Sequence, residues 1–158
     1  MDSDEKIYDS PVGNVKTHIR QYVESNGHKG HMYRGQPTLL LITRGRKSGK
    51  LRRSALIYGR EGPNYIIVAS NAGAVHHPLW YLNLLAQPEV EIQVGADKLK
   101  VHARTVSPQE KLRLWPIMTK IFKTYLLYER KASAAGRKIP VVVLEPLPLW
   151  PPDPPAVL

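Results

Sequence analysis

The residues of this sequence that could bind a ligand most directly lie in one strongly basic turn. Between Arg44 and Arg53, six of the ten residues are lysine or arginine. Like charges held this close together repel one another unless an anion neutralises them. This basic turn (residues 44–53) therefore predicts a polyanionic ligand. The alternative is a solubilising hairpin tip with no ligand.

The basic turn is not the phosphate loop of a nucleoside triphosphatase. Gly45 and Gly49 enclose three residues instead of four, and Leu51 occupies the position where a serine or threonine would bind magnesium. The turn also connects two apolar runs typical of strands, so no helix N-terminus is available for a phosphate. We exclude nucleotide hydrolysis on these grounds.

A loop of small residues follows a buried apolar run and precedes an aromatic segment. The loop comprises residues 70–73, with the sequence Ser-Asn-Ala-Gly, and Pro78 then opens a short helix that carries Trp80. Small residues let a flat ligand approach the backbone closely, and an indole can stack on a ring. The alternatives are an ordinary strand-to-helix connection and a tryptophan that packs in the core.

A third group consists of aromatic residues spaced three apart, Phe122, Tyr125 and Tyr128. Provided that the helix continues beyond Pro116, this spacing places them on one stripe. Such a stripe is most often core, yet a tyrosine hydroxyl in a dry pocket can also donate a proton.

Other catalytic chemistries lack their residues. The chain contains no cysteine, and the histidine pairs His76-His77 and His28/His31 have no acidic ligand at supporting spacing, so we expect no metal site. No Ser-His-Asp order with a nucleophile elbow and no suitable carboxylate pair is present. Redox or group-transfer chemistry would therefore have to come from a bound organic cofactor.

The elements that position these residues are expected to form a small, mostly antiparallel barrel of α+β class. Strands are predicted near 38–43, 51–59, 65–70, 89–94, 99–103 and 139–144, and helices near 12–26, 79–86 and from 107 onward. We expect a single domain over residues 12–146. Residues 1–11 are expected to be disordered, and residues 147–158 to form an extended, proline-rich tail.

The 158-residue chain carries a formal charge of +10, which favours an anionic partner. Nucleic acid is not expected, because no aromatic residue interleaves with the cations of residues 47–54. The acidic N-terminus does not resemble a signal peptide, and no apolar run could span a membrane, so we expect a cytoplasmic protein. The amphipathic helix at 12–26 carries Lys16 and Arg20 and is expected either to contact an anionic membrane peripherally or to cover the barrel mouth as a lid.

Several short motifs, taken in order, resemble one known family. They are residues 45–49 (Gly-Arg-Lys-Ser-Gly), 68–70 (Val-Ala-Ser), 78–84 (Pro-Leu-Trp-Tyr-Leu-Asn-Leu), 115–116 (Trp-Pro) and 139–143 (Ile-Pro-Val-Val-Val). Over residues 38–146 the chain resembles the deazaflavin-dependent nitroreductases and quinone reductases of actinobacteria, which use coenzyme F420. The resemblance implies a split β-barrel related to the flavin-mononucleotide-binding barrels.

The resemblance also implies a site. The phosphate and polyglutamate tail of coenzyme F420 would lie along the basic turn, and the ring would lie near the 70–73 loop and the helix that follows. The aromatic stripe would form the wall of the acceptor site. Two departures are visible, because Phe122 stands where a third tyrosine is expected and Asn71 where a lysine is expected. The cofactor-binding residues implied are Arg46, Lys47, Ser48, Arg52, Arg53, Ser70, Asn71, Ala72, Gly73, Pro78, Trp80 and Asn83.

The expected function is hydride transfer from the reduced coenzyme to a small electrophilic acceptor such as a quinone, a nitroaromatic or an enone. Tyr125 or Tyr128 would donate the proton or orient the acceptor, with Ser70 as the competing donor. Two alternatives are a non-catalytic carrier of the coenzyme and a flavin-mononucleotide-dependent reductase with the same barrel. The oligomeric state stays open.

Overall fold

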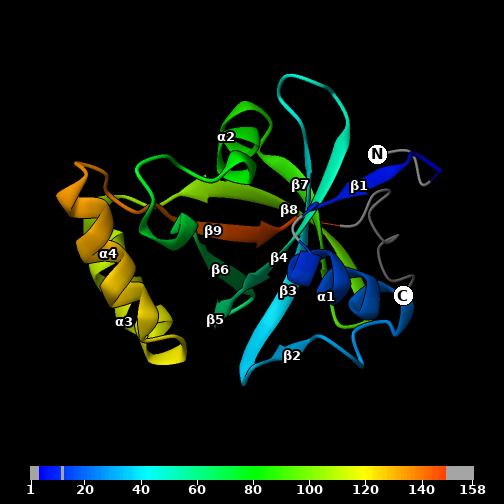
Figure 1. Ribbon diagram of the computed structural model, residues 1–158, viewed down its shortest axis with the longest axis horizontal. Coiled ribbons are helices and arrows are strands. Elements are labelled where there is room, and N and C mark those ends of the chain that lie inside the picture. The colour runs from blue at the N-terminus through cyan, green and yellow to red at the C-terminus, as the bar shows by residue number, and fades with distance from the viewer. Residues whose placement is uncertain (1–3, 12, 149–158) are drawn as a thin grey trace, which may run out of the picture.

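One strongly curved sheet with helices on both of its faces organises the chain. In the computed structural model, which describes residues 4–11 and 13–148, this sheet has nine strands and is accompanied by four α-helices and one 3-10 turn (Figure 1). The strands are β1 (Ile7–Asp9), β2 (Met32–Tyr33), β3 (Gln36–Arg44), β4 (Leu51–Ile57), β5 (Gly59–Glu61), β6 (Asn64–Val68), β7 (Glu89–Val94), β8 (Asp97–Thr105) and β9 (Val141–Pro146). The helices are α1 (Gly13–Glu24), η1 (Asn71–Gly73), α2 (Leu79–Ala86), α3 (Pro108–Ile121) and α4 (Thr124–Ala134).

The strands follow the order β1-β4-β3-β7-β8-β9-β6-β5, and β2 pairs with β3 beside this path. All neighbours are antiparallel except β1 and β4, which run parallel with Ile7 opposite Leu51. Because β1 and β5 end the order without pairing with each other, the sheet is open. The class is therefore α+β, as predicted, with a curved but unclosed sheet.

The inner face of the curved sheet holds the main apolar core. Because side chains alternate along a strand, Leu39 and Leu41 of β3 point inward with Ile67 of β6, while Leu40 points outward. Tyr81 and Leu84 of α2 pack into the same inner core. Helix α2 is thereby attached to the inside of the sheet, close to the β3–β4 turn.

Helices cover the outer face in two places. Helices α3 and α4 pack on Ile66 and Val68 of β6 and on the outward residues of β9, and α1 packs through Ile19 and Tyr22 on Leu40 (Figure 1). Strands buried on both faces need apolar residues at every position, which explains the uninterrupted runs in β3, β6 and β9.

Most predicted elements are confirmed within a few residues, including α2, β7 and the start of α3. Ser107 caps α3, because its Oγ accepts a hydrogen bond of 3.1 Å from the Glu110 N–H. The expectation of one aromatic helix was wrong. Pro116 lies inside α3 without ending it, and the chain instead leaves helical geometry at Phe122, so Tyr125 and Tyr128 belong to α4.

The expectation that residues 1–11 are disordered was also wrong for the described part of this segment. Ile7–Asp9 form β1, because the backbone of β4 offers a free edge and Asp9 pairs with an arginine of that strand. The proline-rich tail lies outside the described residues from residue 149 onward, as does Val12 of the predicted first helix. None of the described helices is both long enough and apolar enough to cross a membrane.

Candidate functional site

The basic turn forms the tip of the β3–β4 hairpin and is ordered by its own backbone. The Gly45 N–H donates to the Lys50 carbonyl at 2.8 Å, and the Gly49 N–H donates to the Gly45 carbonyl at 2.8 Å. Gly49 has a φ of 71°, a left-handed value that favours glycine. Beside the turn lies an open hollow of about 460 Å³, lined by residues 44–49 together with Ala86 and Gln87 at the end of α2.

Two of the six cations are neutralised by the N-terminal segment. Arg44 donates two hydrogen bonds, of 2.9 and 3.0 Å, to the carboxylate of Glu5, and Arg53 donates one of 2.6 Å to Asp9. Arg53 was predicted to hold a ligand, and the structure instead places it in an ion pair. The acidic segment that was expected to be disordered thus supplies part of the neutralisation that the basic turn requires.

The remaining cations divide into two pairs. Lys50 and Arg52 lie over the ring of Tyr8, at 5.1 and 5.6 Å from its centre. Among the described residues, the side chains of Arg46 and Lys47 form no hydrogen bond and no ion pair, and both are exposed beside the hollow. Arg46 and Lys47 are therefore the cations most available to an anionic ligand.

Asn83 links the basic turn to α2. Its Oδ1 accepts a hydrogen bond from the Arg46 N–H at 3.1 Å, and its Nδ2 donates to the Thr43 hydroxyl at 3.1 Å. Only 7% of Asn83 is exposed. Asn83 was predicted to contact a cofactor, but its amide is already bound within the protein and instead fixes the position of Arg46.

The loop after β6 has an unusual backbone. The backbone of Ser70 has a right-handed helical conformation, whereas Asn71 and Ala72 have left-handed φ values of 46° and 54°. The Asn71 side chain donates a hydrogen bond of 2.9 Å to the His76 carbonyl, which closes the loop toward α2. Non-glycine residues in this conformation are uncommon and are held by surrounding contacts, a feature typical of ligand-binding loops.

Arg137 is the residue that sequence reasoning missed. It lies between α4 and β9, is 7% exposed, and hydrogen-bonds the carbonyls of Ala69, Ser70 and Ala74 and the Nδ1 atom of His77. These contacts hold both ends of the loop. The only sequence signal is a charged residue beside an apolar strand, which does not distinguish a buried arginine from an exposed one.

The aromatic residues that were predicted to form one wall do lie together, although Phe122 follows α3 and the two tyrosines belong to α4. Phe122 lies 5.0 Å from Tyr125 and 6.2 Å from Tyr128, measured between ring centres. Tyr125 is 5% exposed and packs against Trp115, and this burial raises the pKa of its hydroxyl above the ordinary value. Tyr128 is only partly buried, so it is the more accessible of the two tyrosines.

The structure brings the predicted groups together in two places. The loop contacts α4, because Gly73 packs against the backbone of Tyr128. Helix α2 contacts the basic turn through Asn83, while Pro78 precedes its first turn and Trp80 is partly buried against the inner core. Loop, α2 and turn therefore line one continuous stretch of the fold, with Tyr128 at one end and Lys47 at the other.

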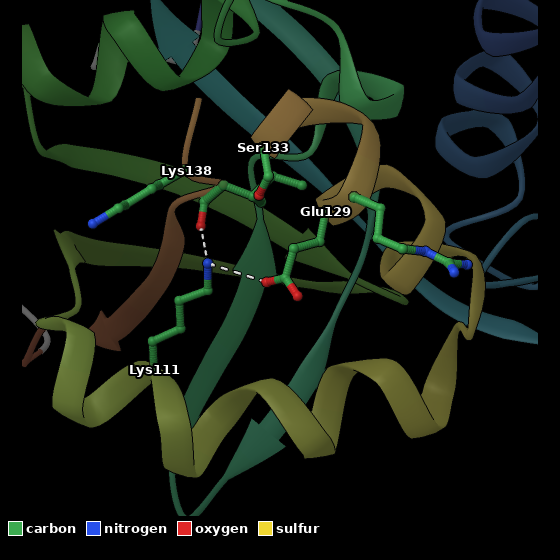
Figure 2. A pocket seen from close by; sticks show the side chains of 6 residues that line it. Lys111, Glu129, Ser133 and Lys138 are labelled. Carbon is green, nitrogen blue, oxygen red and sulfur yellow. Dashed lines mark hydrogen bonds and ion pairs between the residues drawn. The ribbon is translucent and has the colours of Figure 1, made fainter. Parts of the chain in front are cut away.

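A second hollow, of about 450 Å³, lies between α3, α4 and the start of β9 (Figure 2). In it, Lys111 donates a hydrogen bond of 2.7 Å to the Ile139 carbonyl and lies 3.7 Å from the Glu129 carboxylate. Burial lowers the pKa of the Lys111 ammonium. None of the residues that line the second hollow belongs to the basic turn or to the loop, so it is a separate hollow.

Comparison with known proteins identifies relatives across most of the chain. Residues 14–146 match the family described as F420H(2)-dependent quinone reductase. An F420H(2)-dependent quinone reductase of Mycobacterium tuberculosis is 41% identical over 133 residues, which cover 82% of this chain and 88% of that protein. A protein of Mycobacterium bovis described as a putative F420H(2)-dependent quinone reductase gives the same values.

Two solved structures are similar in fold and sequence. A structure described as an F420-H2 dependent reductase (FDR-A) has a TM-score of 0.62 and 35% identity, covering 69% of this chain and 94% of that chain. A structure described as a domain-swapped dimer has a TM-score of 0.65 and 32% identity, covering 86% of this chain and all of that chain.

Proposed function

The chain belongs to the F420H(2)-dependent quinone reductase family, and we propose that its basic turn, its 70–73 loop and α4 form the site at which it transfers a hydride from reduced coenzyme F420 to a quinone. The observation that carries this assignment of the site is the contact of the loop with α4 at one end and the link of α2 to the basic turn at the other. The groups that we assign to the ring, the tail and the acceptor are thereby connected through neighbouring segments.

The residues present suit an anionic tail. Arg46 and Lys47 are exposed and without side-chain partners among the described residues, and they border the hollow beside α2. Ser48 and the exposed Arg52 extend the same surface. A phosphate or carboxylate bound there gains charge-assisted hydrogen bonds while relieving the repulsion between these cations. Arg53 acts indirectly, because Asp9 already holds it.

The loop and α2 suit a flat ring. Ala72 is exposed and Ser70 is partly exposed, so small side chains leave the backbone accessible at these two positions, while Gly73 is buried against α4. Pro78 and Trp80 begin the facing helix. When bound, the reduced coenzyme supplies the hydride. The protein holds the ring and the acceptor in contact and keeps the approach of the acceptor fixed.

Tyr128 is the proton donor that the geometry favours. Its backbone packs against Gly73 of the loop, and the residue is less buried than Tyr125. The raised pKa of Tyr125 makes its hydroxyl a weaker acid, and its packing between Trp115 and Phe122 suits a wall. Ser70 is the competing donor, since it lies in the loop itself. The acceptor then binds beside Tyr128 and the loop, where nitroaromatics and enones would enter as well as quinones.

The membership of the family also suggests the type of fold, the location of the enzyme and its contact with membranes. We propose that the curved sheet is a split β-barrel of the flavin-mononucleotide-binding type, formed by one domain over residues 12–146. The largely antiparallel strand order and the attachment of α2 to the inner core support this proposal. The enzyme acts in the cytoplasm. Any peripheral membrane contact of residues 12–26 uses Lys16 and Arg20, because the apolar face of α1 is buried against Leu40.

The experiment that tests the function is a titration with oxidised coenzyme F420 followed by turnover with menadione. Micromolar binding and oxidation of the reduced coenzyme that depends on menadione are expected. Binding of flavin mononucleotide in its place would indicate an ordinary flavin reductase, and tight binding of the coenzyme without turnover would indicate a carrier. Co-sedimentation with anionic liposomes, with Lys16 and Arg20 changed to glutamine, tests the membrane contact.

A further inference from the structure

Arg137 is a buried cation whose partners are almost entirely backbone. Its Nε donates to the Ala74 carbonyl at 2.7 Å and its Nη1 to the Ala69 carbonyl at 3.1 Å, while Nη2 donates to the Ser70 carbonyl. The fourth partner is the Nδ1 atom of His77, 3.0 Å from Nη1. One guanidinium therefore joins the residue that follows β6, the loop and the segment before α2.

No carboxylate balances this charge within residues 4–11 and 13–148, where the ion pairs of the protein involve other arginines and one lysine. Burial alone lowers the pKa of the Arg137 guanidinium from its ordinary value, and arginine still stays charged. A buried charge without a counter-ion is costly, so it is retained where something else depends on it.

The orientation of three peptide groups depends on Arg137. The carbonyl and the N–H of a trans peptide point in opposite directions. Because the carbonyls of Ala69, Ser70 and Ala74 point at Arg137, the N–H groups of Ser70, Asn71 and Val75 point away from it. No described residue accepts a hydrogen bond from these three N–H groups. The loop thus presents donors on the side opposite the guanidinium.

We propose that Arg137 is a positioning residue of the ring site, which holds the 70–74 loop in its binding conformation and favours a ligand that brings negative charge to the exposed side of that loop. The proposal rests on the proposed function, because the ligand is the coenzyme whose ring lies at this loop. The fork geometry fixes the three carbonyls, and the charge makes the opposing N–H groups better donors to an anionic oxygen.

Three variants separate geometry from charge. Arg137→Met removes the charge and the hydrogen bonds with little change in volume, Arg137→Lys keeps the charge without the fork, and Arg20→Met removes an exposed charge on α1 as the control. Losing charge-assisted hydrogen bonds predicts coenzyme F420 binding about 10- to 100-fold weaker for Arg137→Met, and about 3- to 10-fold weaker for Arg137→Lys. Arg20→Met is expected to bind as the unchanged protein does.

Two readouts do not depend on turnover. In the coenzyme-free protein, hydrogen exchange of the Gly73 and Ala74 amides, which bond to Ser70 and Asn71, is expected to accelerate at least about tenfold in Arg137→Met. In the unchanged protein, coenzyme affinity is expected to fall between pH 7.5 and 5.5, because protonated His77 cannot accept from Arg137. The only other ring that packs on His77 among the described residues is that of Tyr81, whose hydroxyl bonds to Thr105.

The dependence of coenzyme affinity on pH distinguishes a positioning role of Arg137 from a general role in stabilising the fold. If Arg137 positions the loop, its removal is expected to abolish the part of the decline in affinity that His77 contributes. Binding within twofold of the unchanged protein in both folded variants, with unchanged loop exchange, would overturn the proposal. Should Arg137→Met fail to fold, Arg137→Lys decides by the same measurements. An unchanged protein that binds no coenzyme F420 refutes the proposed function instead, while loop exchange still tests the role of Arg137.

Discussion

Gly73 lies directly against the backbone of Tyr128. A Cβ atom added to Gly73 would stand 2.8 Å from the Tyr128 carbonyl oxygen and 3.1 Å from its Cα atom, and Gly73 itself has a φ of 76°. Only glycine satisfies both the left-handed conformation and this close approach. The contact is what places the loop beside the tyrosine that we propose as proton donor.

Gly73→Ala is therefore expected to lower the free energy of unfolding by about 2–4 kcal/mol and to weaken coenzyme binding. Gly35→Ala is a matched control, because Gly35 has a φ of 82° but has nothing within 4 Å of an added Cβ. Gly35→Ala introduces only the backbone strain, so its free energy of unfolding should fall by about 1 kcal/mol. Urea denaturation measures both, and equal losses would show that the Tyr128 contact contributes nothing.

Tyr128→Phe is expected to lower the turnover number about 10²-fold or more at saturating coenzyme, because it removes a proton donor. Tyr125→Phe should mainly change stability or the Michaelis constant for menadione, since Tyr125 is packed between Trp115 and Phe122. Stopped-flow oxidation of the reduced coenzyme gives both parameters. Full turnover in both variants together with a large loss in Ser70→Ala would assign the proton to Ser70.

Asp9→Asn is expected to strengthen binding of the coenzyme about two- to fivefold at low salt, because it releases Arg53 from its ion pair toward the anionic tail. Added salt should diminish this gain, since the charges are near the surface. Asp97→Asn, at the opposite end of the β3 and β7 strands from the basic turn, removes the same charge without affecting Arg53. A gain of equal size in both variants would indicate a general effect of net charge.

His77→Asn is expected to reduce the dependence of stability on acid pH. Burial, and then the charge of Arg137, lower the pKa of His77 below its ordinary value of 6.5. The unfolded chain therefore binds the proton more readily, so the contribution of neutral His77 is fully present above pH 6.5 and is lost as the pH falls toward the folded-state pKa. Between pH 7.5 and 5.5 the melting temperature should fall further, by about one or two degrees, in the unchanged protein than in the variant.

His76→Asn serves as the control for this measurement. His76 is exposed, and among the described residues only its backbone carbonyl is bonded, to the Asn71 side chain. Its variant should keep the pH dependence of the unchanged protein. The contact with Arg137 would not be the cause of the pH dependence if the melting temperature became independent of pH in His76→Asn and kept its pH dependence in His77→Asn.

The elements of the fold could be predicted from the sequence where their signals are local. The apolar runs of β3, β6 and β9, the serine cap of α3 and the proline before α2 lie within a few residues of the structure they specify. The break at Phe122 has no such signal, because neither glycine nor proline marks it, and Pro116 suggested a break that does not occur. Strand β1 has only three residues, too few to show periodicity, and it forms because β4 offers it an edge.

The kind of ligand and the motifs of the family were determined by the sequence alone, since clustered cations, absent cysteines and short ordered motifs are properties of composition and spacing. Which residues are free to act was decided by tertiary structure. Arg53 meets Asp9 across 44 residues of sequence, Asn83 meets Arg46 across 37, and Arg137 meets Ala69 across 68. Such pairings depend on where the folded sheet brings distant segments together, because an ion pair or a buried hydrogen bond requires contact in space that no local pattern encodes.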